Sequence, residues 1–164
     1  MTRGASARSR AMIAFVTAAD PLRPRRRLDA PELDELTAAA VEVLAAQPEV
    51  IAAYLYGSAA RDEPAADLDI AVATRGPVTH RLLETIAAQL QARGAPRGPE
   101  IDVRSLYGAA PRFLFEVLRD GRRIYERDRG ARIEFEARAM AAWLDFAPVW
   151  QRIRDRTREY WAGG

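Results

Sequence analysis

The segment over residues 50–72, VIAAYLYGSAARDEPAADLDIAV, constrains the fold more than any other part of the sequence. An apolar run over residues 50–56 ends at Gly57 and Ser58. A second apolar run, residues 68–72, follows a short polar stretch. Short apolar runs bounded by turn residues are typical of buried strands. The segment therefore predicts two strands joined by a polar turn.

The turn between these runs carries residues suited to an anion. Gly57 has no Cβ, so its backbone can approach a bulky anion closely. Ser58 offers a hydroxyl and a backbone N–H, and if residues 59–61 begin a helix, the positive end of that helix faces the same anion. The turn therefore predicts a phosphate-binding site.

Two carboxylates, Asp67 and Asp69, open the second run. Residues i and i+2 of a strand point to one face, so both side chains aim at one point. Hard oxygen donors in this arrangement suit Mg²⁺ carrying nucleotide phosphates. A phosphate-binding turn opposite a two-carboxylate metal site is typical of phosphoryl or nucleotidyl transfer.

The remaining periodicity predicts an α/β (α+β) chain in which helices pack on a small mixed sheet. Caps, breakers and apolar spacing set the expected elements. These are a helix over 29–46 with Asp29 and Glu32 as a capping pair, strands over 50–56, 68–74 and 101–106, a helix from Thr79 to about Arg93, a helix from Pro111 to Asp120 stopped by Gly121, an edge strand at Ile124-Tyr125, and a helix over 131–161 kinked or divided near Ala147 by Pro148.

Composition narrows the function classes. The chain has no cysteine and a single histidine, His80, which excludes thiolate sites and histidine-cluster metal sites. No stretch reaches the ~20 apolar residues that a membrane span needs. These features favour a cytoplasmic protein.

Charge is unevenly distributed. The formal net charge is +2, yet residues 1–27 hold seven arginines and one acid, Asp20, so the remainder is net negative. This argues against direct nucleic-acid binding by the folded part. We interpret residues 1–28 as a disordered basic tail, 29–128 as the folded core and 129–164 as a helical segment that packs on it.

The motifs resemble the DNA polymerase beta-like nucleotidyltransferase superfamily, whose mark is Gly-Ser, a spacer, Asp-x-Asp and a third carboxylate on a later strand. Asp102, in EIDVRSL, matches the third carboxylate. The closest similarity, over residues 33–160, is to the minimal nucleotidyltransferase (MNT) antitoxins of HEPN/MNT toxin–antitoxin systems. It includes Ala60-Arg61 after the Gly-Ser pair and the aromatic-Leu-Asp-Phe stretch at residues 143–146.

The resemblance implies a fold, a reaction and site residues. Asp67, Asp69 and Asp102 are expected to be catalytic and to hold one or two Mg²⁺ ions. Gly57, Ser58 and Arg61 are expected to bind ATP, although Arg61 fits a salt bridge that fixes the turn slightly better. The implied activity is transfer of AMP to a tyrosine hydroxyl of a HEPN ribonuclease toxin, which silences the toxin.

Two departures from the family pattern keep alternatives open. Asp62 replaces the usual glycine, and the spacer between Ser58 and Asp67 has eight residues where the family usually has ten, with Ala66 in place of a serine. A catalytically weak module that neutralises the toxin by binding, through residues 131–161, is one alternative. A stand-alone small-molecule nucleotidyltransferase is the other.

Overall fold

The computed structural model describes residues 28–61, 65, 67–93 and 99–162. Asp62, Ala66 and the basic stretch over residues 1–27 lie outside this part, so the predictions made for them are not addressed. In the part described, the elements follow the predicted order. The strands are β1 (Val50–Tyr56), β2 (Asp67–Thr74), β3 (Glu100–Ser105) and β4 (Arg122–Glu126); the helices are α1 (Ala30–Ala45), the 3₁₀ turn η1 (Ser58–Arg61), α2 (His80–Arg93), α3 (Pro111–Asp120) and α4 (Arg129–Ala162).

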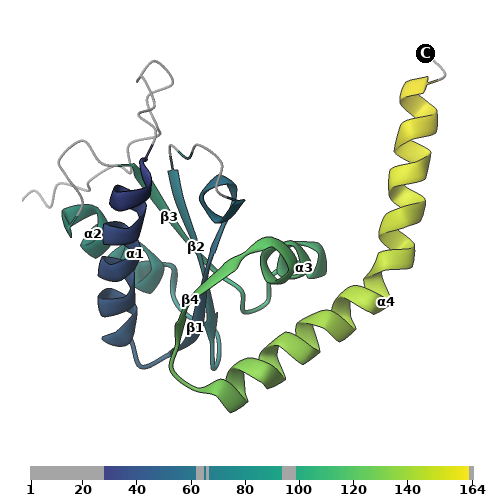
Figure 1. The fold of residues 1–164 in the computed structure, drawn as a ribbon. Helices are drawn as coiled ribbons and strands as arrows, with labels where there is room; N and C mark the ends of the chain where they lie inside the picture. The colour runs from purple at the N-terminus through teal and green to yellow at the C-terminus, as the bar shows by residue number, and fades with distance from the viewer. Residues whose placement is uncertain (1–27, 62–64, 66, 94–98, 163–164) are drawn as a thin grey trace, which may run out of the picture.

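The strands form one mixed sheet in the order β3-β2-β1-β4 (Figure 1). β1 is antiparallel to β2 and β4, whereas β2 is parallel to β3. The prediction of a small mixed sheet with β4 at its edge is confirmed. The parallel pair matters most for function, because it sets the predicted carboxylates of β2 and β3 side by side.

Each face of the sheet packs on its own layer of helices. Leu55, Leu68 and Ile70 belong to a core that α1 and α2 complete through residues such as Leu44 and Leu90. The opposite face packs Tyr54, Ala71 and Ala73 against Leu114 and Val117 of α3 and Ala139 of α4. Because successive strand residues point to opposite faces, the carboxylates on β2 share the α3 side of the sheet.

The predicted helix boundaries are confirmed to within a few residues. Asp29 caps α1 and forms a reciprocal capping box with Glu32. Gly121 ends α3 with φ −78°, so its role is close packing and not a positive φ. A Cβ there would clash with the carbonyl oxygen of Val117. The predicted helix after Gly57 is only the four-residue turn η1, which is too short to supply the helix-dipole field expected from the sequence.

α4 is one continuous helix that contains Pro148 and changes direction near it (Figure 1). Its first half packs on α3, where the ring of Phe115 stacks on Trp143 with centroids 4.5 Å apart. Residues 151–162 are all exposed, and they stand clear of the rest of the described chain. None of the described helices is long and apolar enough to cross a membrane.

Candidate active site

Four carboxylates meet on the parallel strand pair. Asp69 of β2 pairs in register with Asp102 of β3, and Asp67 pairs with Glu100. Their neighbours Leu68 and Ile70 point into the α1–α2 core, so the acidic side chains share the opposite face. The structure thus brings together the three aspartates that the sequence singled out, and it adds Glu100 beside them.

Asp69 lies in the least favourable surroundings for a negative charge. Burial raises the pKa of the Asp69 carboxyl, and the charges of Asp102, Asp67 and Glu100 raise it further. Arg104 acts in the opposite direction, yet the pKa stays above its usual range. A cation at this point would therefore relieve repulsion already built into the sheet.

Asp102 is held by an arginine of its own strand. The Nε of Arg104 donates to Oδ2 of Asp102 at 2.6 Å. Arg104 is two residues further along β3 and thus on the same face as Asp102. In the described structure this arginine is the direct partner of the third predicted metal ligand.

Gly57 lies directly against Asp69. Its φ is +72°, a conformation that favours glycine, and a Cβ at this position would overlap the Asp69 carboxylate. The strand pairing of Tyr56 with Asp69 brings the turn to this point. The close approach seen at Gly57 is to the Asp69 carboxylate. Its predicted use, close approach to a bound anion, stays a prediction.

A pocket of about 380 Å³ opens beside Gly57 and is lined by Arg61 of η1 and by residues of α3. The hydrogen bond and charge of Arg119 lower the pKa of Asp120 at the end of α3, and the charge of Arg61 lowers it further, so the Arg61 guanidinium lies toward that helix. This position is compatible with both predicted roles of Arg61, a phosphate contact or a contact that fixes the turn. Ser58 begins η1, directly after Gly57.

A second pocket, of about 440 Å³, lies on the β3 side of the aspartates. Its described lining carries five carboxylates and neither arginine nor lysine; the acids are Asp67, Asp69, Glu84, Glu100 and Asp102. His80, in the first turn of α2, also lines it; its side chain is largely exposed and lies 3.1 Å from Glu84. Asp69 therefore lines the acidic pocket, and Gly57, which lies against Asp69, lines the other pocket, whose charge is mixed.

The donor set fits a divalent cation. Carboxylate oxygens on adjacent strands are the ligands that Mg²⁺ prefers, and their mutual repulsion is relieved when a cation binds. Among the residues that the structure describes, no three histidine, aspartate or glutamate side chains already stand in a metal-binding cluster. Asp102 is engaged by Arg104 instead, so a three-carboxylate site requires Asp102 to exchange partners.

Tyr56 and Arg104 are site residues that sequence reasoning missed. The Tyr56 hydroxyl is buried and has no hydrogen-bond partner among the described atoms. Burial raises its pKa to about 12, and the charges of Asp69 and Asp102 act in the same direction. Its ring packs edge-on against Phe113 at 5.4 Å. The sequence contained one signal for Arg104. It follows Asp102 by two positions, and side chains two positions apart on a strand share a face.

The sheet order, the glycine turn and the paired aspartates agree with the predicted nucleotidyltransferase fold. The sequence profile of the family described as "Polymerase beta, Nucleotidyltransferase" matches residues 39–130, more than half of the chain. The chain belongs to this family, and the predicted superfamily is confirmed. Among curated protein sequences, none matches the chain significantly.

Several solved structures share the fold. A chain from the rebuilt complex of tri-AMPylated HEPN toxin from Shewanella oneidensis with MNT antitoxin is 18% identical, with a TM-score of 0.61, covering 77% of this chain and 98% of that one. A chain from a toxin–antitoxin crystal structure with AMP-PNP is 18% identical, with a TM-score of 0.63, covering 74% and 98%. A chain from the toxin–antitoxin MntA-HepT is 18% identical, with a TM-score of 0.59, covering 75% and 97%. At these identities the likeness establishes the fold.

Proposed function

We propose that this protein is a Mg²⁺-dependent nucleotidyltransferase of the antitoxin type, which transfers AMP from ATP to a tyrosine hydroxyl of a HEPN ribonuclease toxin. Family membership supports the reaction class. The similar chains come from complexes that include a tri-AMPylated HEPN toxin and a toxin–antitoxin with AMP-PNP, which supports the donor and the acceptor protein. The observation that carries the proposal is the in-register pair of Asp69 and Asp102 beside Gly57.

The aspartates have separate roles in this proposal. Asp67 and Asp69 would hold one or two Mg²⁺ ions, and Asp102 would complete the metal site. The chemistry that Mg²⁺ supplies when bound is neutralisation of the triphosphate charge and stabilisation of the attacking and leaving oxygens. The raised pKa of Asp69 means that ionising this carboxyl is less favourable than for an ordinary aspartate, and a bound cation would favour its charged form.

The transfer step follows from these positions. The acceptor tyrosine oxygen bonds to the α-phosphorus of ATP, the bond from that phosphorus to the pyrophosphate oxygen breaks, and Asp102 receives the tyrosine proton. Pyrophosphate leaves. The backbone at Gly57, together with Ser58 and Arg61, holds the β- and γ-phosphates, because the turn gives close backbone approach and Arg61 lines the adjoining pocket.

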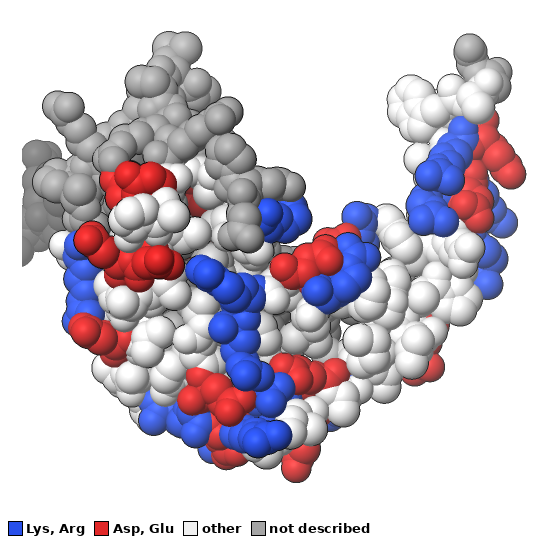
Figure 2. All heavy atoms as spheres, viewed as in Figure 1, with Lys and Arg blue, Asp and Glu red and all other residues white. Residues whose placement is uncertain are grey.

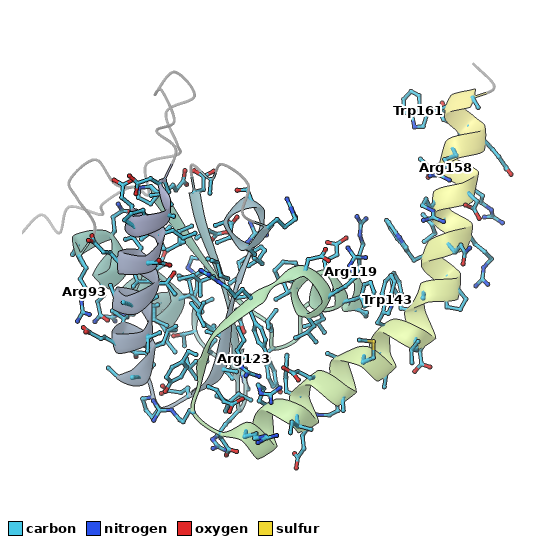
Figure 3. The ribbon with its side chains drawn as sticks, viewed as in Figure 1. Arg93, Arg119, Arg123, Trp143, Arg158 and Trp161 are labelled. Carbon is cyan, nitrogen blue, oxygen red and sulfur yellow. The ribbon has the colours of Figure 1, made fainter. Side chains whose placement is uncertain are left out.

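The free half of α4 is the proposed contact surface for the toxin. Residues 151–162 are exposed, and an isolated helical stretch of this length is marginal in water without packing. Its exposed apolar side chains are Ile153, Tyr160 and Trp161, and the same stretch carries four arginines. Aromatic residues and arginine are enriched at protein interfaces. Figure 2 shows basic and acidic groups mixed along this half, and Figure 3 labels Arg158 and Trp161 near its end. In this proposal 29–128 form the catalytic core and 129–164 the segment that binds the partner.

An ATP-dependence test separates catalysis from binding. The toxin encoded beside this protein would be incubated with it and Mg²⁺, with either ATP or the non-transferable analogue AMP-PNP, and then stripped from the complex under denaturing conditions and refolded. Ribonuclease activity measured afterwards should be lost only with ATP, because covalent AMP persists while bound antitoxin is removed. The Asp67→Ala/Asp69→Ala variant is the control and should leave the toxin active.

A binding-only antitoxin is the second candidate. It is favoured by the absence of a preassembled three-carboxylate cluster in the described chain, together with the exposed half of α4. In this case the toxin is silent in every complex, including that with the double variant. It regains full activity after stripping, whichever nucleotide was present.

A further inference from the structure

Among the described residues, Arg104 is an arginine that the strand register places on the same face as the proposed metal ligands. It lies on β3 two residues after Asp102 and pairs in register with Ala71, which itself follows Asp69 by two residues on β2. All four side chains therefore share one face of the sheet. Ala71 contributes only a methyl group at this position, so no long β2 side chain comes between Arg104 and the aspartates.

The Arg104–Asp102 ion pair is short, and it lies at the surface and not in the buried core. The Nε–Oδ2 distance is 2.6 Å, and the two side chains are 61% and 42% exposed. The hydrogen bond to Asp102 raises the pKa of Arg104, and the charge of Arg104 also reaches Asp69 and the unpartnered Tyr56 hydroxyl. Exposure leaves both partners able to turn, because exposed ion pairs are individually weak.

We propose that Arg104 is a positioning residue that changes partner during the reaction cycle. Before substrate binds, it serves as an internal counter-cation that occupies Asp102. When nucleotide and divalent cation bind, it releases Asp102 as a metal ligand and binds a phosphate oxygen of the nucleotide. This inference rests on the proposed function only in requiring that the site bind a divalent cation and a nucleoside triphosphate.

The exchange leaves both Arg104 and Asp102 with a partner of opposite charge in each state. In the resting state the guanidinium offsets part of the repulsion between Asp102 and Asp69. In the loaded state a bound divalent cation would offset the carboxylate charges, and the guanidinium of Arg104 is free to pair with phosphate, because its planar fork matches a phosphate as well as it matches a carboxylate. The exchange also accounts for the lack of a preassembled three-carboxylate cluster among the described residues.

The Arg104→Gln variant tests the pairing with Asp102 and the contact with phosphate separately. Both tests measure binding and neither depends on catalysis. Mn²⁺ binding to the full chain would be followed by electron paramagnetic resonance, first without nucleotide. AMP-PNP binding would then be measured by calorimetry at saturating Mn²⁺. The variant should bind Mn²⁺ about two- to fivefold more tightly, because a competing exposed ion pair is lost. It should bind AMP-PNP about tenfold more weakly, because a charge-assisted contact to phosphate is lost.

Arg93→Gln is the matched control. Arg93 makes an ion pair of the same length, 2.6 Å to Glu42, and is also exposed, but it lies on α2 outside both pockets. It should change neither affinity. Arg104→Lys should retain wild-type Mn²⁺ affinity while recovering only part of the AMP-PNP affinity, because lysine keeps the charge and lacks the planar fork.

Opposite changes in the two affinities are a result that a merely structural role would not produce. Unchanged or weaker Mn²⁺ binding by Arg104→Gln would overturn the resting-state role, and unchanged AMP-PNP binding would overturn the phosphate role. If the wild-type chain binds neither Mn²⁺ nor AMP-PNP, the proposed function itself is wrong and this inference fails with it. A melting curve equal to that of Arg93→Gln establishes that Arg104→Gln is folded.

Discussion

The backbone of Gly57 lies so close to the carboxylate of Asp69 that any side chain at position 57 would overlap it. The turn that is expected to hold phosphate and the strand that is expected to hold the metal are therefore one packed unit. A substitution that moves the turn at Gly57 should therefore also move the Asp69 carboxylate, and the reverse.

Gly57→Ala should lower the stability of the fold and the affinity for Mn²⁺ by more than the backbone strain at position 57 accounts for. The positive φ costs an alanine about 1 kcal/mol, and the new methyl group must also displace the Asp69 carboxylate. We expect a loss of roughly 2–3 kcal/mol in the free energy of unfolding, as for other overpacked sites, with Mn²⁺ affinity lowered at least tenfold. Urea denaturation and Mn²⁺ titration measure the two effects.

Gly108→Ala is the matched control for this substitution. Gly108 has φ +71°, but a Cβ there meets no atom within 4 Å. It should therefore lose only about 1 kcal/mol of stability and keep its Mn²⁺ affinity. Equal losses for the two variants would show that the contact with Asp69 is not sterically limiting.

Asp69→Asn should stabilise the metal-free protein at neutral pH. The folded state raises the pKa of Asp69, so folding favours its protonated form, and the charged form above that pKa destabilises the fold. Wild-type stability should therefore rise as the pH falls through the folded pKa toward the ordinary aspartate pKa, and this rise should be smaller in Asp69→Asn. Melting temperatures in EDTA across this acidic range measure the difference.

Asp128→Asn provides a comparison of opposite sign. Hydrogen bonds from the Ala131 backbone and from Arg75 lower the pKa of Asp128, so its charged form stabilises the fold. This contribution is lost as the pH falls through the lowered pKa. Asp128→Asn should therefore melt at a lower temperature than wild type at neutral pH. If Asp69→Asn also lowers the melting temperature in EDTA, the repulsion inferred between the carboxylates is wrong.

Tyr56→Phe should leave the metal-free fold at least as stable as wild type. The hydroxyl is buried without a partner in the described structure, and an unsatisfied polar group of this kind costs about 1–3 kcal/mol. Phenylalanine keeps the ring contact with Phe113. Chemical denaturation should show a gain of up to about 1 kcal/mol. A clear loss would mean that the hydroxyl has a stabilising partner, such as a bound water.

Removal of residues 151–164 should spare the fold and weaken the complex. The described residues of this segment are all exposed, so the free energy of unfolding should change by no more than about 0.5 kcal/mol. Affinity for the toxin should fall at least tenfold, measured by calorimetry. Trp143→Ala is the contrasting variant, because it removes the stack on Phe115 and should cost roughly 2–3 kcal/mol of stability. Full toxin affinity after truncation would place the interface elsewhere.

The local pattern of the sequence was sufficient to predict the elements around the site. The apolar run over residues 50–56, the break at Gly57 and the two aspartates two positions apart predict strand, turn and strand, because each signal depends on residues close in the chain. Asp102 required the family resemblance, since its register opposite Asp69 is a tertiary fact that periodicity does not contain.

The sequence could not predict which ion pairs the side chains form or how far each helix extends into solvent. The Arg104–Asp102 pair depends on strand register and on the small residue at Ala71. The length of η1 and the exposed half of α4 depend on packing against elements distant in the chain.

The most direct test of the account is the intact mass of the toxin after incubation with this protein, ATP and Mg²⁺. The account predicts a gain of whole AMP units on the toxin, mapped to tyrosine by peptide sequencing, and no gain with Asp67→Ala/Asp69→Ala. A stable complex in which the toxin is silenced but keeps its unmodified mass would contradict the account and identify the protein as a binding module.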